Sequence, residues 1–126
     1  MYKLEDVRKE TLKYFKGNEL ATNIWIDKYC LKSKEGTYLE LSPYDMNIRI
    51  AAELARIEAN YPNPIKYEEL VELLEEYIIP GGSILYGAGN NHSISSLANC
   101  FVIGTDDDSY GGICTMDQEQ VQLMKR

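Results

Sequence analysis

The sequence predicts an α+β fold, in which a mainly helical region over residues 1–79 is followed by strands and tight turns over residues 80–126. Charge and glycine are distributed unevenly between these regions. Residues 1–79 hold 15 acidic and 11 basic side chains and two glycines, whereas residues 80–126 hold 5 acidic and 2 basic side chains and seven glycines. Frequent charges beside an apolar stripe are typical of surface helices, and glycine-rich turns between apolar runs are typical of strands.

Length and composition argue against several classes of protein. A chain of 126 residues allows one domain, or one domain and part of a second. The net charge of −7 argues against direct nucleic-acid binding, because such surfaces neutralise phosphates with Lys and Arg. A single histidine and the lack of a Cys-x-x-Cys pair argue against a zinc site.

The cellular location is predicted from what the sequence lacks. It has no apolar run of about 18 residues that could span a membrane, and its charged start is unlike a signal peptide. We therefore expect a cytoplasmic protein without membrane contact, in which Cys30, Cys100 and Cys114 are reduced thiols.

The first two helices are predicted from apolar spacing and from the break between them. Residues 4–15 have helical spacing, and Gly17 and Asn18 end that segment. Asn18 can then cap a second helix. The apolar side of that helix is predicted to consist of Leu20, Ala21, Ile24 and Trp25. The turn at residues 34–37 weakly indicates a short hairpin.

Two longer helices follow. Ser42 is predicted to cap a helix that has Pro43 at its first position, by accepting the amide of Asp45, and this helix should stop near Asn60 because prolines follow. The next helix should turn an apolar face inward and an acidic, solvated face outward. The predicted outward residues are Glu68, Glu69, Glu72, Glu75 and Glu76.

The last third is predicted to contain two strands and one helix. Residues 83–86 form a short strand candidate, and residues 100–103 form an apolar run that suits a sheet buried on both faces. A final helix is expected to begin near Asp117, with Gln120 completing a capping box.

The candidate functional residues in this region, each considered alone, are explained by ordinary structural roles. Gly87-Ala88-Gly89 lacks the third glycine of a dinucleotide fingerprint, so a simple loop is expected. The aspartates at 106–108 lack the alternate spacing of a calcium loop. Cys100 is expected to be a small buried residue, although a thiol where a buried strand meets a glycine-rich loop could also face a cleft.

Several blocks of this sequence, taken together, resemble the N-terminal segment of the ribonucleotide reductase large (catalytic, alpha) subunit, class I or class II. The blocks in the last third are Pro80-Gly81-Gly82-Ser83-Ile84-Leu85, Gly87-Ala88-Gly89-Asn90-Asn91, Ser96-Leu97-Ala98-Asn99-Cys100-Phe101-Val102-Ile103 and Asp108-Ser109-Tyr110-Gly111-Gly112-Ile113. Upstream, Trp25-Ile26-Asp27-Lys28-Tyr29 and the helix after Ser42 are similar to the helical region of that family. The resemblance implies a helical domain over residues 1–79 and the first strands of an incomplete ten-stranded α/β barrel over residues 80–126.

The resemblance also implies residue roles. Cys100 matches the N-terminal cysteine of the redox pair that reduces ribonucleotides to deoxyribonucleotides in thiyl-radical chemistry. Ser83 and Asn99 fall where the family lines its substrate pocket. Asp108 matches the acidic residue that holds the ribose of the allosteric effector, with Asp107 as a competing assignment. The final helix matches the one that leads to the dimer contact.

Other parts of the family's machinery would lie beyond Arg126, among them the radical cysteine and the second redox cysteine. We therefore expect a piece that is inactive without the remaining C-terminal part of the reductase, and that binds no cofactor itself. The resemblance leaves the radical generator open between a metal-bearing partner subunit and adenosylcobalamin, and the substrate open between diphosphates and triphosphates. The alternative is a non-catalytic helical interaction module whose C-terminal strand docks on a partner protein.

Overall fold

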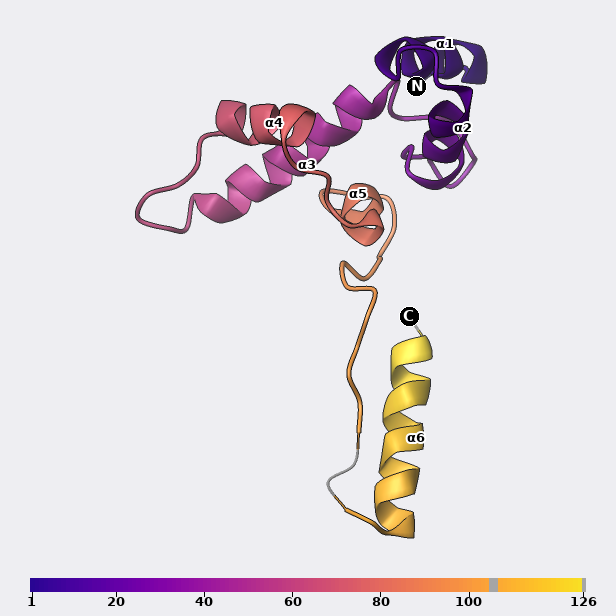
Figure 1. Cartoon of the computed structure of the whole chain (residues 1–126), viewed down its shortest axis with the longest axis vertical. Helices are drawn as coiled ribbons and strands as arrows, with labels where there is room; N and C mark the ends of the chain where they lie inside the picture. The colour runs from indigo at the N-terminus through magenta and orange to yellow at the C-terminus, as the bar shows by residue number, and fades with distance from the viewer. Residues whose placement is uncertain (105–106, 126) are drawn as a thin grey trace.

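A computed structural model describes residues 1–104 and 107–125, and these residues form a helical body followed by a long connection and one further helix (Figure 1). Within these ranges there are six helices: α1 (Leu4–Tyr14), α2 (Glu19–Lys28), α3 (Pro43–Glu58), α4 (Tyr67–Glu76), α5 (Gly82–Gly87) and α6 (Tyr110–Met124). None of these helices is both long and apolar enough to cross a lipid bilayer.

The core of the helical body forms around α3. This helix packs along α4 and contacts α5 and α1, while α1 packs against α2. Ile50 and Ala51 of α3 and Val7 of α1 are completely buried. The buried apolar cluster consists of Val7, Trp25, Ile26, Cys30, Met46, Ile50, Ala51, Leu70, Leu74 and Ala88. Burial of this apolar surface is the main term that stabilises the packing.

The predicted boundaries of the first four helices are mostly confirmed, but one cap differs. Asn18 Oδ1 accepts the Ala21 amide at 3.0 Å and caps α2, as predicted. Ser42 makes no side-chain cap on α3. Instead, the Asp45 carboxylate in the first turn reaches back and accepts the Leu41 amide at 2.7 Å. The carboxylate still lies at the positive end of α3, where the helix dipole favours it.

The inward face of α2 differs from the predicted one. Trp25 is buried, but Leu20 is 70% exposed and Ile24 is 40% exposed, whereas Thr22 and Ile26 are buried. Thr22 tolerates burial because its hydroxyl donates to the Asn18 carbonyl at 2.8 Å. The buried side of α2 is therefore rotated from the most apolar side of its sequence.

The segment between α2 and α3 is a rudimentary hairpin. Isolated bridges join Tyr38 to Lys32 and to Tyr2. The Leu39 amide donates to the Leu31 carbonyl, and the Ser33 amide donates to the Thr37 carbonyl, both at 2.9 Å. This pairing agrees with the weak hairpin signal of the sequence, and it places Cys30 and Glu40 inside the body.

The predicted strands of the last third are not present in the described residues. Residues 83–86 belong to α5, whose first turn closes with the Ile84 and Leu85 amides donating to the Gly81 carbonyl. Residues 100–103 pair with no strand within residues 1–104 and 107–125, and Val102 is fully exposed. A strand needs a neighbour to satisfy its backbone groups. The α+β prediction is therefore correct for the helical domain, while the barrel strands are not seen.

The last helix begins seven residues before its predicted start. Ser109, not Asp117, caps α6, because its hydroxyl accepts the Gly112 amide at 3.1 Å. No residue of α6 is buried. Figure 1 shows α6 standing apart from the helical body at the end of the connection that follows α5.

Candidate functional site

A buried ion pair joins the hairpin to the segment that follows α4. Arg49 of α3 donates through Nε to Glu40 Oε1 at 2.7 Å, and the two side chains are 11% and 6% exposed. The other carboxylate oxygen, Oε2, accepts the Leu31 amide at 2.9 Å. Both charges are thus paired and hydrogen-bonded, which is the condition for keeping them inside a protein.

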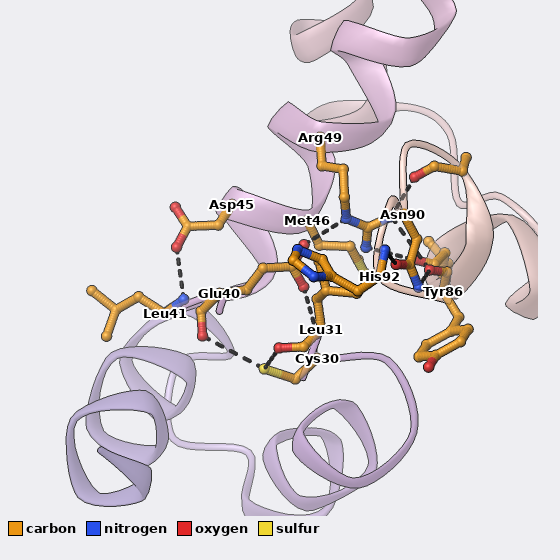
Figure 2. A network of polar contacts seen from close by, with 12 residues as sticks. Cys30, Leu31, Glu40, Leu41, Asp45, Met46, Arg49, Tyr86, Asn90 and His92 are labelled. Atoms are coloured by element: carbon orange, nitrogen blue, oxygen red, sulfur yellow. Dashed lines mark hydrogen bonds and ion pairs between the residues drawn. The ribbon is translucent and has the colours of Figure 1, made fainter. Parts of the chain in front are cut away.

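The remaining nitrogens of Arg49 bind the carboxyl end of α5. Nη2 donates to the Leu85 carbonyl at 2.8 Å, and Nη1 donates to the carbonyls of Tyr86, at 3.5 Å, and Ala88. Figure 2 shows the guanidinium between the Glu40 carboxylate and the turn that carries Tyr86 and Asn90. Arg49 therefore satisfies carbonyls that a helix end leaves without partners.

The glycine-rich loop after α5 is shaped by Asn90 and by Gly89. Asn90 Oδ1 accepts the amides of His92 and Ser93, at 2.8 and 3.3 Å, which makes a side-chain turn. Gly89 has a φ of +70°, and a Cβ at this position would lie 2.9 Å from Arg49 Cγ and from the Arg49 carbonyl oxygen. This close approach requires glycine, so the loop backbone lies directly on Arg49.

A cavity of about 450 Å³ lies between this loop and the C-terminal half of α3. Backbone and small polar side chains form much of its wall. Its lining residues are Glu53, Arg56, Gly87, Ala88, Gly89, Asn90, Asn91, Ser93, Ile94, Ser95 and Leu97. The only charged pair among them is Glu53 with Arg56, at 2.6 Å.

Ser83 and Asn99, the two residues predicted to line the substrate pocket, contact one another. Ser83 Oγ donates a hydrogen bond to Asn99 Oδ1 across a separation of 16 residues. Ser83 lies in the first turn of α5 and is half-buried, whereas Asn99 is exposed. The contact brings the start of α5 to the residue that precedes Cys100.

Cys100 is an exposed, free thiol. The expectation of a small buried residue, drawn from its immediate context, is therefore wrong for this structure, because residues 100–102 of the apolar run are exposed. Cys114 of α6 is also exposed and free, and Cys30 is free but buried. Among the described residues, no group of three or more His, Cys, Asp and Glu side chains is placed to hold a metal ion.

Asp108 is exposed and lies directly before Ser109, the cap of α6. The competing residue Asp107 accepts a hydrogen bond from the Ser109 hydroxyl at 2.6 Å. Asp106, the first of the three aspartates, lies outside the described residues. The structure therefore puts both Asp107 and Asp108 at the N-terminus of α6 and leaves the choice between them open.

Cys30 differs chemically from the other two thiols. Burial, assisted by the nearby Glu40 charge, raises its pKa from 9.0 to about 12. Its sulfur donates to the Glu40 carbonyl at 3.5 Å. The thiol is thus held in its neutral, unreactive form, as expected of a packing residue.

Sequence reasoning did not find Arg49 or Glu40. Arg49 lies directly before the completely buried Ile50, and Glu40 follows the apolar Leu39. A charged residue embedded in a predicted core pattern is the signal that points to a buried pair. Their distance in sequence and the irregular segment around Glu40 hide the partnership.

Comparison with protein families gives one result that bears on this arrangement. Residues 15–93 match the family described as "Ribonucleotide reductase, all-alpha domain". No curated protein and no solved structure matches the chain. The matched range runs from the end of α1 through α5 and the loop that Arg49 supports. Because it covers more than half of the sequence, the chain belongs to the ribonucleotide reductase all-alpha domain family, the N-terminal domain of the reductase large subunit.

Proposed function

We propose that this chain forms the N-terminal part of a ribonucleotide reductase catalytic subunit, which converts ribonucleotides to deoxyribonucleotides. The observation that carries the proposal is the family match over residues 15–93, which ends a few residues before Asn99 and Cys100. A redox cysteine would therefore follow directly on a domain of the right family. Ser83 and Asn99 lie in contact beside it and supply hydroxyl and amide groups for a polar substrate.

The proposed chemistry gives Cys100 one of two reducing thiols. Replacing the ribose 2′-hydroxyl by hydrogen consumes two electrons and releases water. Cys100 and a second cysteine, supplied by the rest of the subunit, deliver these electrons and two protons as they close to a disulfide. The role needs a free thiol, and Cys100 takes part in no disulfide within the chain.

The N-terminus of α6 is proposed to take part in allosteric control. Asp108 would accept hydrogen bonds from the ribose hydroxyls of a nucleotide effector, and α6 would lead into the dimer contact. The exposure of Asp108 and its position directly before the Ser109 cap support this assignment. Asp107 stays the competing assignment, because its carboxylate lies at the same helix start and accepts the Ser109 hydroxyl.

We also propose that the chain has no turnover by itself. Val102 is fully exposed and Phe101 is 53% exposed. An exposed apolar run of this kind is typical of a surface that another polypeptide covers. Strands from the rest of the subunit would cover this run. The radical generator, whether a metal-bearing subunit or adenosylcobalamin, would bind elsewhere in the complex. Since the reaction uses reduced thiols, the complex is expected in the cytoplasm.

The experiment combines the chain with a polypeptide that carries the remainder of a reductase large subunit, together with its radical generator and a dithiol reductant. Formation of deoxyribonucleotide is then measured for wild type, Cys100→Ser and Cys114→Ser. The proposal expects turnover in the complex, none in the chain alone, and loss of turnover in Cys100→Ser only. Full turnover in Cys100→Ser would refute the role of this cysteine.

The competing function is a non-catalytic helical module that docks its C-terminal segment on a partner protein. The exposure of residues 91–102 and the lack of any buried residue in α6 favour such docking. The same experiment separates the two functions, because a non-catalytic module yields no deoxyribonucleotide when it is combined with the remainder of the subunit.

A further inference from the structure

We propose that Arg49 is a positioning residue for the nucleotide site: held by Glu40, it fixes α5 and the glycine-rich loop so that Ser83 faces Asn99. This inference rests on the proposed function for its nucleotide part. The anchoring of residues 82–90 by Arg49 does not depend on that function.

The first argument is that α5 is too short to be stable without contacts to the rest of the protein. It has six residues, Gly82–Gly87, with glycine at both ends. A single turn of helix is unstable in water, because its nucleation cost is not repaid by the few bonds that it forms. No residue of α5 is fully buried, although Ile84 and Leu85 pack partly buried against the core. The three carbonyl bonds from Arg49 are therefore a large share of what fixes this segment.

The second argument is that Arg49 is itself held in place. Nε is bound to Glu40 Oε1 at 2.7 Å, and the second oxygen of Glu40 is bound to the Leu31 amide at 2.9 Å. The guanidinium is planar, so fixing one edge fixes the direction of its other donors. The position of the α5 carbonyls is thereby tied to the hairpin and to α3, both parts of the packed body.

The third argument is the path from Arg49 to the proposed substrate residues. Arg49 binds the carbonyl of Leu85, and Ser83 lies two residues earlier in the same helical turn. On the other side, the backbone of Gly89 rests on the Arg49 stem. A tilt of α5 would move Ser83 away from Asn99, the neighbour of Cys100, and would open the wall of the cavity beside α3.

The test uses three variants and one control. Arg49→Lys keeps a positive charge for Glu40, but it lacks the additional guanidinium N–H groups that donate to the carbonyls at the end of α5. Arg49→Met would leave the buried Glu40 charge without its cationic partner. It is therefore made together with Glu40→Gln, whose side-chain oxygen can still accept the Leu31 amide. Glu40→Gln alone shows the effect of loosening Arg49. The control is Arg8→Met, which removes an exposed pair with Glu19 on the surface of α1 and α2.

Two measurements are made on each variant. The first is hydrogen exchange of the Ile84, Leu85, Ala88 and Asn90 amides, which are hydrogen-bonded within this segment. The second is KM and kcat for a ribonucleotide in the complex with the rest of the subunit. In Glu40→Gln/Arg49→Met and in Arg49→Lys we expect these amides to exchange about tenfold faster or more, while amides of α1 and α2 are unchanged.

In the same two variants KM should rise roughly tenfold with a smaller change in kcat, since substrate positioning is lost and the cysteine is retained. Arg8→Met should change neither measurement. Unchanged exchange at residues 84–90 would overturn the anchoring, and faster exchange with an unchanged KM would overturn the link to the nucleotide site. A wild-type complex without turnover would instead refute the proposed function and the nucleotide part with it, while the exchange data would still decide the anchoring.

Discussion

Asn47 of α3 donates a 2.6 Å hydrogen bond from Nδ2 to Glu75 Oε1 of α4. This bond joins the two helices of the body that pack most extensively against one another. The hydroxyl of Tyr14, at the end of α1, donates to the same oxygen at 3.2 Å. Glu75 was predicted to face solvent with the other acids of α4, and its partly buried position corrects that prediction. One carboxylate oxygen thus ties three helices together.

Replacing Asn47 by alanine should destabilise the body. Asn47 is 5% exposed, and its amide also lies 3.5 Å from the Leu74 carbonyl. The change removes this donor and one of the two donors to Glu75 Oε1, and leaves only Tyr14 on that oxygen. We expect a loss of about 1–3 kcal/mol in the free energy of unfolding, measured by urea denaturation. Glu72→Ala, on the exposed face of α4, is the control and should change stability little. Equal losses in both variants would mean that the Glu75 contact contributes nothing specific.

Stability should fall as the pH rises through the ordinary range of thiol and tyrosine ionisation, because the folded chain holds two of these groups in their protonated form. Burial, and then the charge of Glu75, raises the pKa of Tyr14 from 10.0 to about 12, and burial likewise raises that of Cys30 from 9.0 to about 12. The folded chain holds both protons more tightly than the unfolded chain. Stability is therefore full below about pH 9 and falls as the pH rises toward 12.

This pH dependence is measured by urea denaturation between pH 8 and pH 11 in wild type and in Tyr14→Phe/Cys30→Ala. The double variant removes both titrating groups, so its stability should fall less steeply over that interval, whatever its absolute value. Tyr61→Phe, at an exposed position, should keep the wild-type slope. A double variant with the wild-type slope would contradict the assignment.

The three cysteines should differ in reactivity. Cys100 and Cys114 are exposed, whereas Cys30 is 2% exposed and its pKa is raised. A thiol reagent at pH 8 should modify two cysteines quickly and the third only after denaturation, because the thiolate is the reactive form. Peptide mapping identifies the sites. Rapid modification of Cys30 in the native chain would show that the hairpin and α2 do not cover it.

A methyl group at Gly89 should damage the loop. Gly89 combines a φ of +70° with a site where a Cβ would lie 2.9 Å from backbone oxygen of Arg49. Gly89→Ala is expected to cost about 1 kcal/mol or more, from strain at positive φ together with the clash. Gly81→Ala, where a Cβ would meet nothing within 4 Å, is the matched control. Thermal unfolding of both variants checks the difference, and equal melting temperatures would refute the close packing of the loop on Arg49.

The helical body was predictable because its signals are local. Asn18 as a cap, Pro43 at a first helical position and the prolines after Asn60 each act within one turn of the residues that they affect. The apolar period of α3 and α4 extends over several turns and correctly marks Ile50, Leu70 and Leu74 as buried. Leu54 and Ile57 follow the same period in α3, but they are 38% and 41% exposed. The buried face of α2 was less predictable, because packing in the folded body buries Thr22 and leaves the more apolar Leu20 exposed.

The last third was less predictable because its signals are short or depend on distant partners. Four residues at 83–86 are too few to distinguish a helical turn from a strand. The glycines at 111 and 112 disfavour helix on propensity, yet the Ser109 cap starts α6 there. Ser83 and Asn99 were named as site residues from family resemblance, and their contact spans 16 residues that no local pattern connects. The Glu40–Arg49 pair is likewise a tertiary contact.

The most direct test of the central claim is a single turnover of the complex formed by this chain and the rest of a reductase large subunit. The complex is fully reduced, freed of external reductant and given ribonucleotide, and Cys100 is then alkylated and quantified by mass spectrometry. We predict that one Cys100 thiol is lost to a disulfide for each deoxyribonucleotide formed, while Cys30 and Cys114 remain thiols. Deoxyribonucleotide formation with Cys100 still fully alkylatable would contradict the account.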